Sequence, residues 1–194
     1  FVIGEKMEKI DLRKKQIESL KEFADENQKK VEDKKLLDKF TSTNLWKNSQ
    51  SIGITSSLPI EVDTSELIAR LWDEGKDVYL ARANNDPDHT QDFLEYTYMT
   101  KLKKSKFGVD EVANPDAKIN NELDLIVVPG LAFALDSHAR LGFGGGYYDR
   151  FLKKYPTKTI ALANSRMVFE HAQWPVENFD VPIQTIITPT KIYK

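Results

Sequence analysis

The sequence predicts an α/β protein, in which a three-layer open, mainly parallel sheet carries helices on both faces and follows an N-terminal helical segment. Three observations predict this fold. Residues 5–47 are rich in Lys and Glu and contain no Pro, whereas beyond residue 50 short apolar runs alternate with helical patterns. The apolar run at residues 123–128 ends at Pro129 and Gly130, a profile typical of a buried parallel strand. Strands that alternate with helices form sheets that are covered on both faces.

The N-terminal segment, residues 5–47, is expected to form two helices that break near residues 25–28 and pack on the α/β body. Apolar residues recur with a helical period in both halves. The stripe of the first helix is expected at Ile10, Ile17, Leu20 and Ala24, and that of the second at Val31, Leu36, Leu37, Phe40 and Trp46. Residues 1–40 contain eleven Lys or Arg and ten Asp or Glu, which indicates solvated helix faces and not a basic arm.

Short apolar runs predict the strands of the sheet. They are expected at residues 51–56, 77–82, 93–99, 123–128, 159–163 and 183–188. The last four residues before the apolar run at 67–72, from Asp63 to Glu66, resemble a capping box, and the helix that they begin is expected to end at Gly75.

Composition excludes several classes of protein. The chain has 194 residues, which suits a single domain over residues 1–194, and its formal charge of −2 argues against nucleic acid as a partner. It contains no cysteine, which excludes disulfides and thiolate metal sites, and no apolar run reaches the ~20 residues that span a bilayer. Its first residues become charged too early for a secretory signal. We therefore expect a cytoplasmic monomer that binds small molecules and neither nucleic acid nor membrane.

Residues 140–152 read Arg-Leu-Gly-Phe-Gly-Gly-Gly-Tyr-Tyr-Asp-Arg-Phe-Leu, and four of the nine glycines fall within five of these positions. Glycines let the backbone approach a ligand closely, and a helix that begins after them aims unpaired N–H groups at an anion. Arg140 and Arg150 add donors shaped for phosphate. The run therefore predicts a phosphate site at the carboxyl edge of the sheet, with a flexible connection before a surface helix as the alternative interpretation. Its spacing is neither a dinucleotide fingerprint nor a Walker motif.

The same residues resemble the 5-formyltetrahydrofolate cyclo-ligase family, also called the 5,10-methenyltetrahydrofolate synthetases. The resemblance rests on Pro129-Gly130-Leu131-Ala132-Phe133 and on the glycine–tyrosine run at 140–152. Shorter matches are the basic pair Lys9 and Arg13, the segment Glu61-Val62-Asp63-Thr64, and the tail Trp174-Pro175-Val176-Glu177-Asn178-Phe179-Asp180. Together these segments extend the resemblance over essentially the whole chain.

This resemblance implies an ATP-dependent enzyme that converts 5-formyltetrahydrofolate to 5,10-methenyltetrahydrofolate and releases ADP and phosphate. Transfer of the γ-phosphoryl group to the formyl oxygen would turn that oxygen into a leaving group, and N10 of the folate would then attack the formyl carbon. Such chemistry needs groups that position the phosphates and neutralise their charge. Mg²⁺ is the implied metal, with ATP as the co-substrate.

The resemblance also assigns roles to individual residues. ATP would be bound by Lys9, Arg13, Arg140, Leu141, Gly142, Phe143, Gly144, Gly145, Gly146, Tyr147 and Tyr148. The folate substrate would contact Ser56, Glu61, Phe143, Gly144, Gly145, Gly146 and Tyr147. Asp149 and Asp180 would hold Mg²⁺, and Arg140 and Asp149 would serve catalysis. Of the two adjacent tyrosines, one is expected to pack in the core.

The chain departs from the family pattern at residues 134–139, where it is one residue longer and has Ala134 in place of an aspartate. Asp136 is a candidate replacement for that carboxylate. Two other functions stay open at this point: a non-catalytic nucleotide- or folate-binding module, and a sugar-phosphate isomerase-like α/β enzyme. The isomerase hypothesis lacks a motif for a proton-abstracting base.

Overall fold

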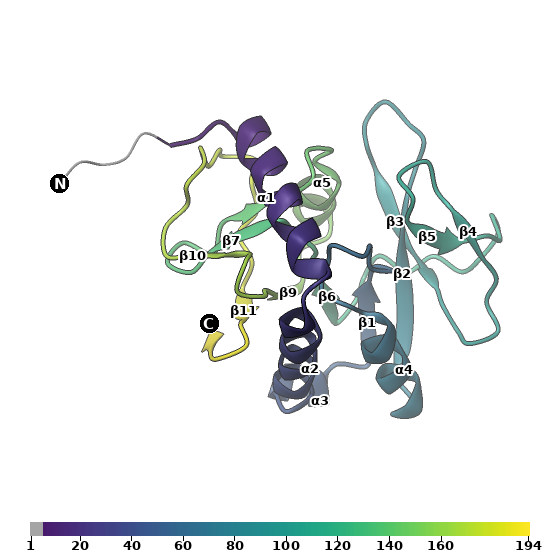
Figure 1. Cartoon of the computed structure of the whole chain (residues 1–194). Coiled ribbons are helices and arrows are strands. Elements are labelled where there is room, and N and C mark those ends of the chain that lie inside the picture. The colour runs from purple at the N-terminus through teal and green to yellow at the C-terminus, as the bar shows by residue number, and fades with distance from the viewer. Residues whose placement is uncertain (1–5) are drawn as a thin grey trace.

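Seven strands form the main sheet of the protein, in the order β12-β11-β9-β6-β1-β2-β3 (Figure 1). A computed structural model describes residues 6–194, so residue 5 of the predicted helical segment lies outside the described residues. The strands are β1 (Ser51–Ile54), β2 (Asp77–Ala83), β3 (Gln91–Glu95), β6 (Leu125–Val127), β9 (Lys158–Leu162), β11 (Thr185–Ile187) and β12 (Ile192–Tyr193). The five central strands run parallel, and β3 and β12 pair antiparallel at the two edges. The predicted α/β class with a mainly parallel sheet is confirmed.

The central strands are buried on both faces, which explains why they read as continuous apolar runs. All three residues of β6 are buried, and its neighbour β1 pairs with it through Ile52 opposite Leu125. In Figure 1, helices α2 (Asn27–Thr41) and α4 (Ser65–Asp73) lie in front of the sheet, and α5 (Tyr147–Lys154) lies behind it. The sheet is therefore the middle of three layers.

The order of the strands creates a ligand-binding edge. From β1 the chain passes through α4 to β2 on one side, and it later returns to β6 on the other side of β1 and continues through α5 to β9. In an open α/β sheet, such a reversal opens a crevice outside the carboxyl ends of the two strands. The segments that leave β1 and β6 therefore border the expected ligand site.

The N-terminal segment forms α1 (Lys9–Ala24), α2 and a short α3 (Asn44–Asn48), and the break between the first two helices falls near the predicted position. The predicted apolar stripe of α1 is correct only in part. Leu20 is buried and Ile17 packs against the core, but Ile10 is 63% exposed, and the buried face also contains Leu12, Gln16 and Phe23. The buried face contains a polar residue, Gln16, whose Nε2 donates to the carbonyl oxygens of Leu131 at 2.7 Å and Arg166 at 3.0 Å.

The second helix follows its predicted stripe more closely. Leu36, Leu37 and Phe40 are buried, and Trp46 is buried on α3, but Val31 is exposed. A buried carboxylate, Glu32, joins α2 to the α/β body by accepting hydrogen bonds from the backbone and hydroxyl of Ser165.

Five further strands form two small sheets that the sequence patterns did not predict. One contains β10 (Val168–Phe169), β7 (Ala132–Ala134) and β8 (Arg140–Leu141), and the other pairs β4 (Leu102–Lys104) with β5 (Asp110–Val112). Each of these strands has only two or three residues, which is too short to show a period. The two small sheets place the β4–β5 hairpin and the start of the glycine run at the ligand-binding edge.

Two local predictions are corrected by the structure. The strand expected at residues 93–99 ends at Glu95, because Thr97 and Thr100 bond to each other in a turn that leaves Tyr98 and Met99 exposed. The predicted capping box does not form. Asp63 accepts hydrogen bonds from the backbone and the hydroxyl of Ser65, and the N-cap residue of α4, Thr64, makes no side-chain capping hydrogen bond. Within residues 6–194, no helix has the length and apolar composition needed to cross a bilayer.

We predict that Gln16→Leu destabilises the fold. It leaves two partly buried carbonyl oxygens without a donor, so the free energy of unfolding should fall by about 1–3 kcal/mol, measured by denaturant unfolding. The control is Lys15→Leu on the exposed face of the same helix, which should change it by no more than about 0.5 kcal/mol. Equal unfolding midpoints for the two variants would contradict the assigned role of Gln16.

Candidate active site

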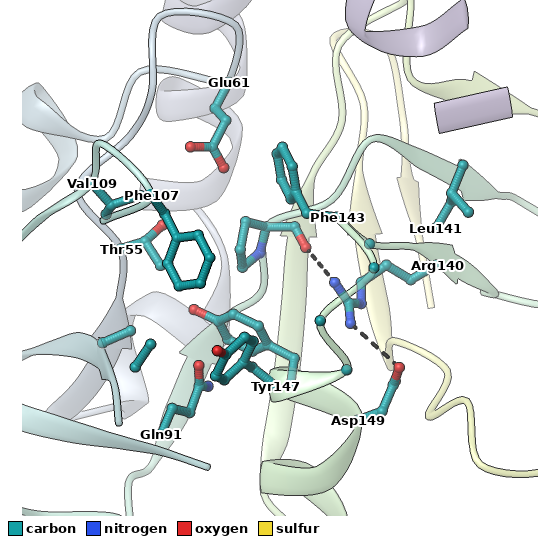
Figure 2. Close-up of a pocket in the computed structure, with 18 of the residues that line it drawn as sticks. Thr55, Glu61, Gln91, Phe107, Val109, Arg140, Leu141, Phe143, Tyr147 and Asp149 are labelled. Carbon is teal, nitrogen blue, oxygen red and sulfur yellow. Dashed lines mark hydrogen bonds and ion pairs between the residues drawn. The ribbon is translucent and has the colours of Figure 1, made fainter. Parts of the chain in front are cut away.

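A pocket of about 460 Å³ lies at the carboxyl ends of β1 and β6, where the strand order predicts a ligand (Figure 2). Thr55 and Ser56 follow β1, and Pro129 follows β6. The remaining walls come from α1, the glycine run, the start of α5, the β4–β5 hairpin and the segment that contains Asp180. Segments from almost the whole length of the chain therefore meet at one cavity.

The glycine run forms the loop between β8 and α5. Gly144 and Gly146 have φ angles of 106° and 72°, in the region that favours glycine, and Gly146 is the N-cap of α5. A Cβ atom at Gly144 would lie 3.4 Å from the guanidinium carbon of Arg13, so the missing side chain also makes room for a cation. Because the first backbone N–H groups of a helix have no partner within it, the start of α5 faces the pocket as an anion-binding end.

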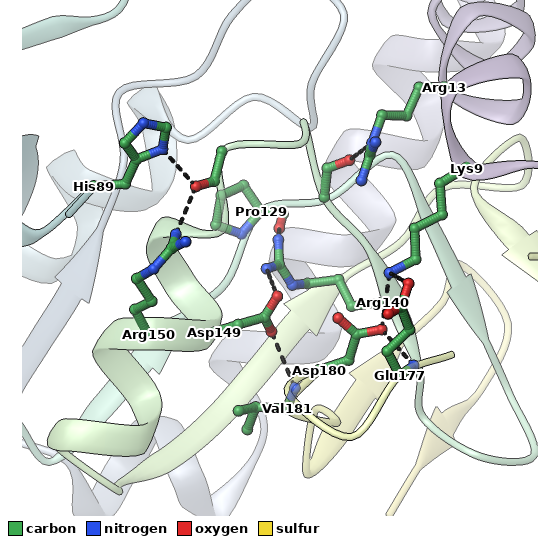
Figure 3. A network of polar contacts seen from close by, with 12 residues as sticks. Lys9, Arg13, His89, Pro129, Arg140, Asp149, Arg150, Glu177, Asp180 and Val181 are labelled. Carbon is green, nitrogen blue, oxygen red and sulfur yellow. Dashed lines mark hydrogen bonds and ion pairs between the residues drawn. The ribbon is translucent and has the colours of Figure 1, made fainter. Parts of the chain in front are cut away.

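Arg140 is the most buried cation of the site, with 6% of its side chain exposed. Its Nη1 donates to the carbonyl oxygen of Pro129 at 2.9 Å, and its Nη2 lies 3.7 Å from Oδ2 of Asp149 (Figures 2 and 3). The guanidinium carbon also lies 5.5 Å from the centre of the Tyr148 ring. Burial lowers the pKa of Arg140 from its usual value, and the carboxylate of Asp149 opposes that shift. The contacts with Pro129, Asp149 and Tyr148 hold the guanidinium in place.

Two further cations reach the pocket from α1, four residues apart on one helix face. Arg13 donates from Nε to the carbonyl oxygen of Gly142 at 2.9 Å, and Lys9 lies 3.0 Å from Oδ2 of Asp180 (Figure 3). The same carboxylate oxygen of Asp180 also accepts from the backbone N–H of Glu177 at 2.9 Å. The first helix is thus linked to both the glycine run and the C-terminal segment.

The opposite end of the pocket is less charged. Glu61 turns back on its own loop, where Oε1 accepts from the backbone N–H of Leu58 at 2.7 Å. Burial raises the pKa of Glu61 above its usual value, and that hydrogen bond offsets the shift only in part. The apolar side chains of Leu58, Ala81 and Val109 line the same pocket.

Aromatic rings border the mouth of the pocket. Tyr147 stacks on His89 with ring centres 5.1 Å apart and planes 14° from parallel, and Phe107, on the β4–β5 hairpin, meets Tyr147 edge-on at 6.1 Å. Phe143, in the glycine run, is 45% exposed. A flat ring of a ligand can therefore pack against aromatic side chains on more than one side.

The comparisons with known proteins agree with this geometry. The sequence profile of the 5-formyltetrahydrofolate cyclo-ligase family matches residues 5–189. The chain belongs to the 5-formyltetrahydrofolate cyclo-ligase family. It is 31% identical over 152 residues to the 5-formyltetrahydrofolate cyclo-ligase of Escherichia coli K12, covering 75% of this chain and 81% of that one. It is 33% identical over 149 residues to the enzyme of the same name from Haemophilus influenzae, covering 73% and 76% of the two chains.

A solved structure from the same family has the same fold. The NMR structure of Aquifex aeolicus 5,10-methenyltetrahydrofolate synthetase aligns with a TM-score of 0.79 and 27% identity, over 97% of this chain and 93% of that chain. The cyclo-ligase resemblance read from the sequence is therefore confirmed, and it argues against the sugar-phosphate isomerase hypothesis.

The residues that the family resemblance assigned to the site all line this one pocket. Arg150, expected from the sequence to offer donors to phosphate, does not line it: the side chain is exposed and its Nη1 donates to the carbonyl oxygen of Gly145 at 2.9 Å. Figure 2 shows Glu61 on the opposite side of the pocket from Arg140 and Asp149. Of the two adjacent tyrosines, Tyr148 is the buried one, at 8% exposure, as expected for one of the pair. Tyr147 is the more exposed ring at the mouth.

The sequence analysis missed lining residues from several elements. They are Thr55, Leu58, Ala81, Ala83, Gln91, Ser105, Phe107, Val109, Glu111, Pro129 and Phe179. Ser105, Phe107, Val109 and Glu111 lie in the β4–β5 hairpin, whose strands are too short for a periodic signal. The segment Ser105 to Val109 contains Gly108 with a φ of 76°, so a tight turn could have been read from Lys-Phe-Gly, but not its position above the pocket.

The segment at which the chain departs from the family pattern, residues 134–139, forms the turn between β7 and β8 and does not line the pocket. His138 occupies the left-handed region there, with a φ of 62°, and its Nδ1 contacts the carbonyl oxygen of Ile183 at 2.7 Å. Asp136 accepts from the backbone of Ser137 and pairs with exposed His171. Asp136 is therefore a turn residue outside the pocket lining.

We predict that Glu61→Gln stabilises the protein at neutral pH. Because burial raises the pKa of Glu61 in the folded state, stability falls as the pH rises from the ordinary value of 4.5 through the raised folded value. Gln keeps the acceptor for Leu58 without the charge, so the variant should gain free energy of unfolding over this window and match the wild type below it. Exposed Glu66→Gln on α4 is the control and should show no such pH-dependent gain.

Proposed function

We propose that this chain catalyses the reaction of its family, the ATP-dependent conversion of 5-formyltetrahydrofolate to 5,10-methenyltetrahydrofolate. The observation that carries the proposal is the two-ended pocket, which places a phosphate-binding loop with three cations beside an aromatic and apolar chamber with a buried carboxyl. A nucleotide triphosphate and a flat heterocycle fit these two ends by their chemistry. Their reacting groups would meet at the glycine run between them.

The reaction needs the formyl oxygen to leave. Transfer of the γ-phosphoryl group of ATP to this oxygen gives an iminium phosphate and releases ADP. N10 then forms a bond to the formyl carbon and releases its proton to solvent, the C–O bond breaks, and inorganic phosphate departs with the oxygen. Phosphoryl transfer is accelerated mainly by positioning and by charge neutralisation, which are the two tasks that the pocket residues can perform.

The phosphate end is assigned to the glycine run with Lys9, Arg13 and Arg140. The backbone N–H groups at the start of α5 cradle the phosphates, and Arg140 is held rigid by Pro129 and Asp149 beneath them. Arg13 is the adaptable member, because its guanidinium is only partly buried and is held at a single backbone carbonyl, that of Gly142. Together they neutralise the charge that shifts from the γ-phosphate during transfer.

The folate end is assigned to Ser56 and Glu61, with Phe143 and Tyr147 packing on the rings. A carboxylate can accept two parallel hydrogen bonds from the ring N–H and the amino group of a pterin. Since the pKa of Glu61 is raised, its charge is costly in the free protein and is better accommodated once such donors are bound.

Asp149 and Asp180 fit a magnesium ion as a pair of hard oxygen ligands on one wall of the pocket. Within the described residues no group of three or more His, Asp or Glu side chains is placed to hold a metal alone. Mg²⁺ commonly uses one or two carboxylates and takes its remaining ligands from phosphates and water, which suits this pair. When bound, it would neutralise charge on the transferring phosphates.

The proposal extends to the domain organisation, the oligomeric state and the location of the protein. We infer that residues 1–194 act as a single domain and as a monomer in the cytoplasm, because one chain supplies every residue assigned to the pocket and contains no cysteine for disulfides.

A direct assay tests the reaction. The absorbance of the methenyl product should rise when the protein is mixed with 5-formyltetrahydrofolate, ATP and Mg²⁺, and should stay flat when either ATP or Mg²⁺ is omitted. A product that forms equally without ATP, or no product at all, would refute the proposed activity.

The two ends of the pocket can be tested separately. Arg13→Ala should raise the KM for ATP about tenfold or more, because it removes a charged contact, and should leave the KM for 5-formyltetrahydrofolate within about twofold. Glu61→Gln should instead raise the KM for 5-formyltetrahydrofolate and leave the KM for ATP within about twofold. The control for Arg13 is Lys14→Ala, an exposed neighbour on α1 that should change neither KM. If Arg13→Ala and Glu61→Gln affected the same substrate, the division of the pocket would be wrong.

A further inference from the structure

Two side chains outside the pocket lining hold one carbonyl group of the glycine run. The carbonyl oxygen of Gly145 lies 2.8 Å from Nδ1 of His89 and accepts from Nη1 of Arg150 at 2.9 Å. Because a carbonyl oxygen can only accept, Nδ1 carries the hydrogen. Figure 3 shows the two side chains converging on this oxygen, one from the loop between β2 and β3 and the other from α5. Gly145 lines the pocket, whereas His89 and Arg150 do not, so the carbonyl is held from outside the pocket.

Both side chains also pack closely against the glycine run. A Cβ atom at Gly146 would lie 2.5 Å from Nη1 of Arg150, so the guanidinium fills the space that a side chain would need. The imidazole of His89 stacks on Tyr147, and a Cβ atom at Gly145 would lie 2.5 Å from the Tyr147 ring. Both positions therefore need glycine if the two donors and the tyrosine are to keep their places.

The loop that carries His89 holds this residue in an uncommon conformation. His89 has a φ of 52°, and in residues 6–194 the only other non-glycine residue with a positive φ is His138. Asp86 closes the turn, because its carbonyl oxygen accepts from the backbone N–H of His89 and its carboxylate accepts from the backbone and the hydroxyl of Thr90. Costly backbone conformations of this kind cluster at functional sites. The turn thus directs the imidazole toward the glycine run.

The direction of the Gly145 carbonyl sets the direction of the next backbone N–H. In a trans peptide, such as the one between Gly145 and Gly146, the C=O and N–H bonds lie in one plane and point in opposite directions. A carbonyl held outside the pocket therefore turns the N–H of Gly146 toward it. Since both residues are glycine, this peptide could otherwise flip at little steric cost. The two donors remove that freedom.

We propose that His89 and Arg150 are positioning residues for phosphate binding, which hold the peptide between Gly145 and Gly146 with its N–H facing the phosphates of ATP. Their role rests on the proposed function, which places those phosphates at the glycine run. Arg150 thereby receives a task different from the one predicted from the sequence, since its donor binds the backbone of the loop and not the phosphate.

Two variants at residue 89 separate the donor from the ring. Asn and Gly both tolerate a φ of 52° and both lack the imidazole that stacks on Tyr147, but only Asn carries an N–H where Nδ1 lies. His89→Gly should raise the Kd for ATP with Mg²⁺ about fivefold, and His89→Asn should keep it within about twofold of the wild type. The Kd for 5-formyltetrahydrofolate should be equal in the two variants. Each ligand is titrated alone by calorimetry, and exposed His171→Gly, outside the pocket, is the control and should change neither Kd.

A double-mutant cycle tests whether the two donors act on one carbonyl. Arg150→Ala should raise the Kd for ATP about threefold or more. Because either donor alone still holds the carbonyl in part, the double variant of His89→Gly with Arg150→Ala should lose more than the product of the two single losses. Losses that simply multiply would overturn the shared role, because an Arg150 that acted through its charge alone would be independent of residue 89.

Equal Kd values for ATP in His89→Asn and His89→Gly would also overturn the proposal. Binding does not require turnover, so a wild type that binds ATP without forming the methenyl product would refute the proposed function and still report on His89. A wild type that binds 5-formyltetrahydrofolate but no ATP would overturn the positioning role. If His89→Gly fails to fold in a thermal melt, Arg150→Ala decides the question, and an unchanged Kd for ATP there overturns the proposal.

Discussion

The buried guanidinium of Arg140 holds three parts of the site together. It reaches the carbonyl oxygen that follows β6, the carboxylate of Asp149 in the first turn of α5, and the face of the Tyr148 ring. Asp149 in turn accepts from the backbone N–H of Val181, at the start of the segment that leads to β11. A cation buried this deeply is stable only when such partners are in place, so strand end, glycine run and helix must adopt their positions together.

Around Arg140, energetically unfavourable side-chain environments and backbone conformations lie where the ligands are expected. Glu61 is partly buried with a raised pKa, and Gly144 and Gly146 occupy backbone conformations that few other residues tolerate. The buried polar side chains of Gln16 and Glu32, which lie outside the pocket, are paired with specific partners. Local costs at a ligand pocket of this kind are typical of functional sites.

Much of this structure could be predicted from the sequence, and the physical reasons can be named. The buried parallel strands appeared as apolar runs because both faces are covered, and the glycine run was legible because close approach and positive φ leave few other residue choices. The buried face of α1 was not predicted correctly, because Gln16 reads as a surface residue until its two carbonyl partners are known. Strands of two or three residues show no period, so the hairpin that carries Phe107 could not be predicted.

The position of α1 has a consequence for protein synthesis. Lys9 and Arg13 are made first, yet their contacts are Asp180, Glu177 and Gly142, which leave the ribosome far later. The cationic end of the pocket is therefore the last part of the site to be completed, although it begins with the first helix. A nascent chain therefore lacks the complete cationic end of the pocket until its C-terminal segment has emerged.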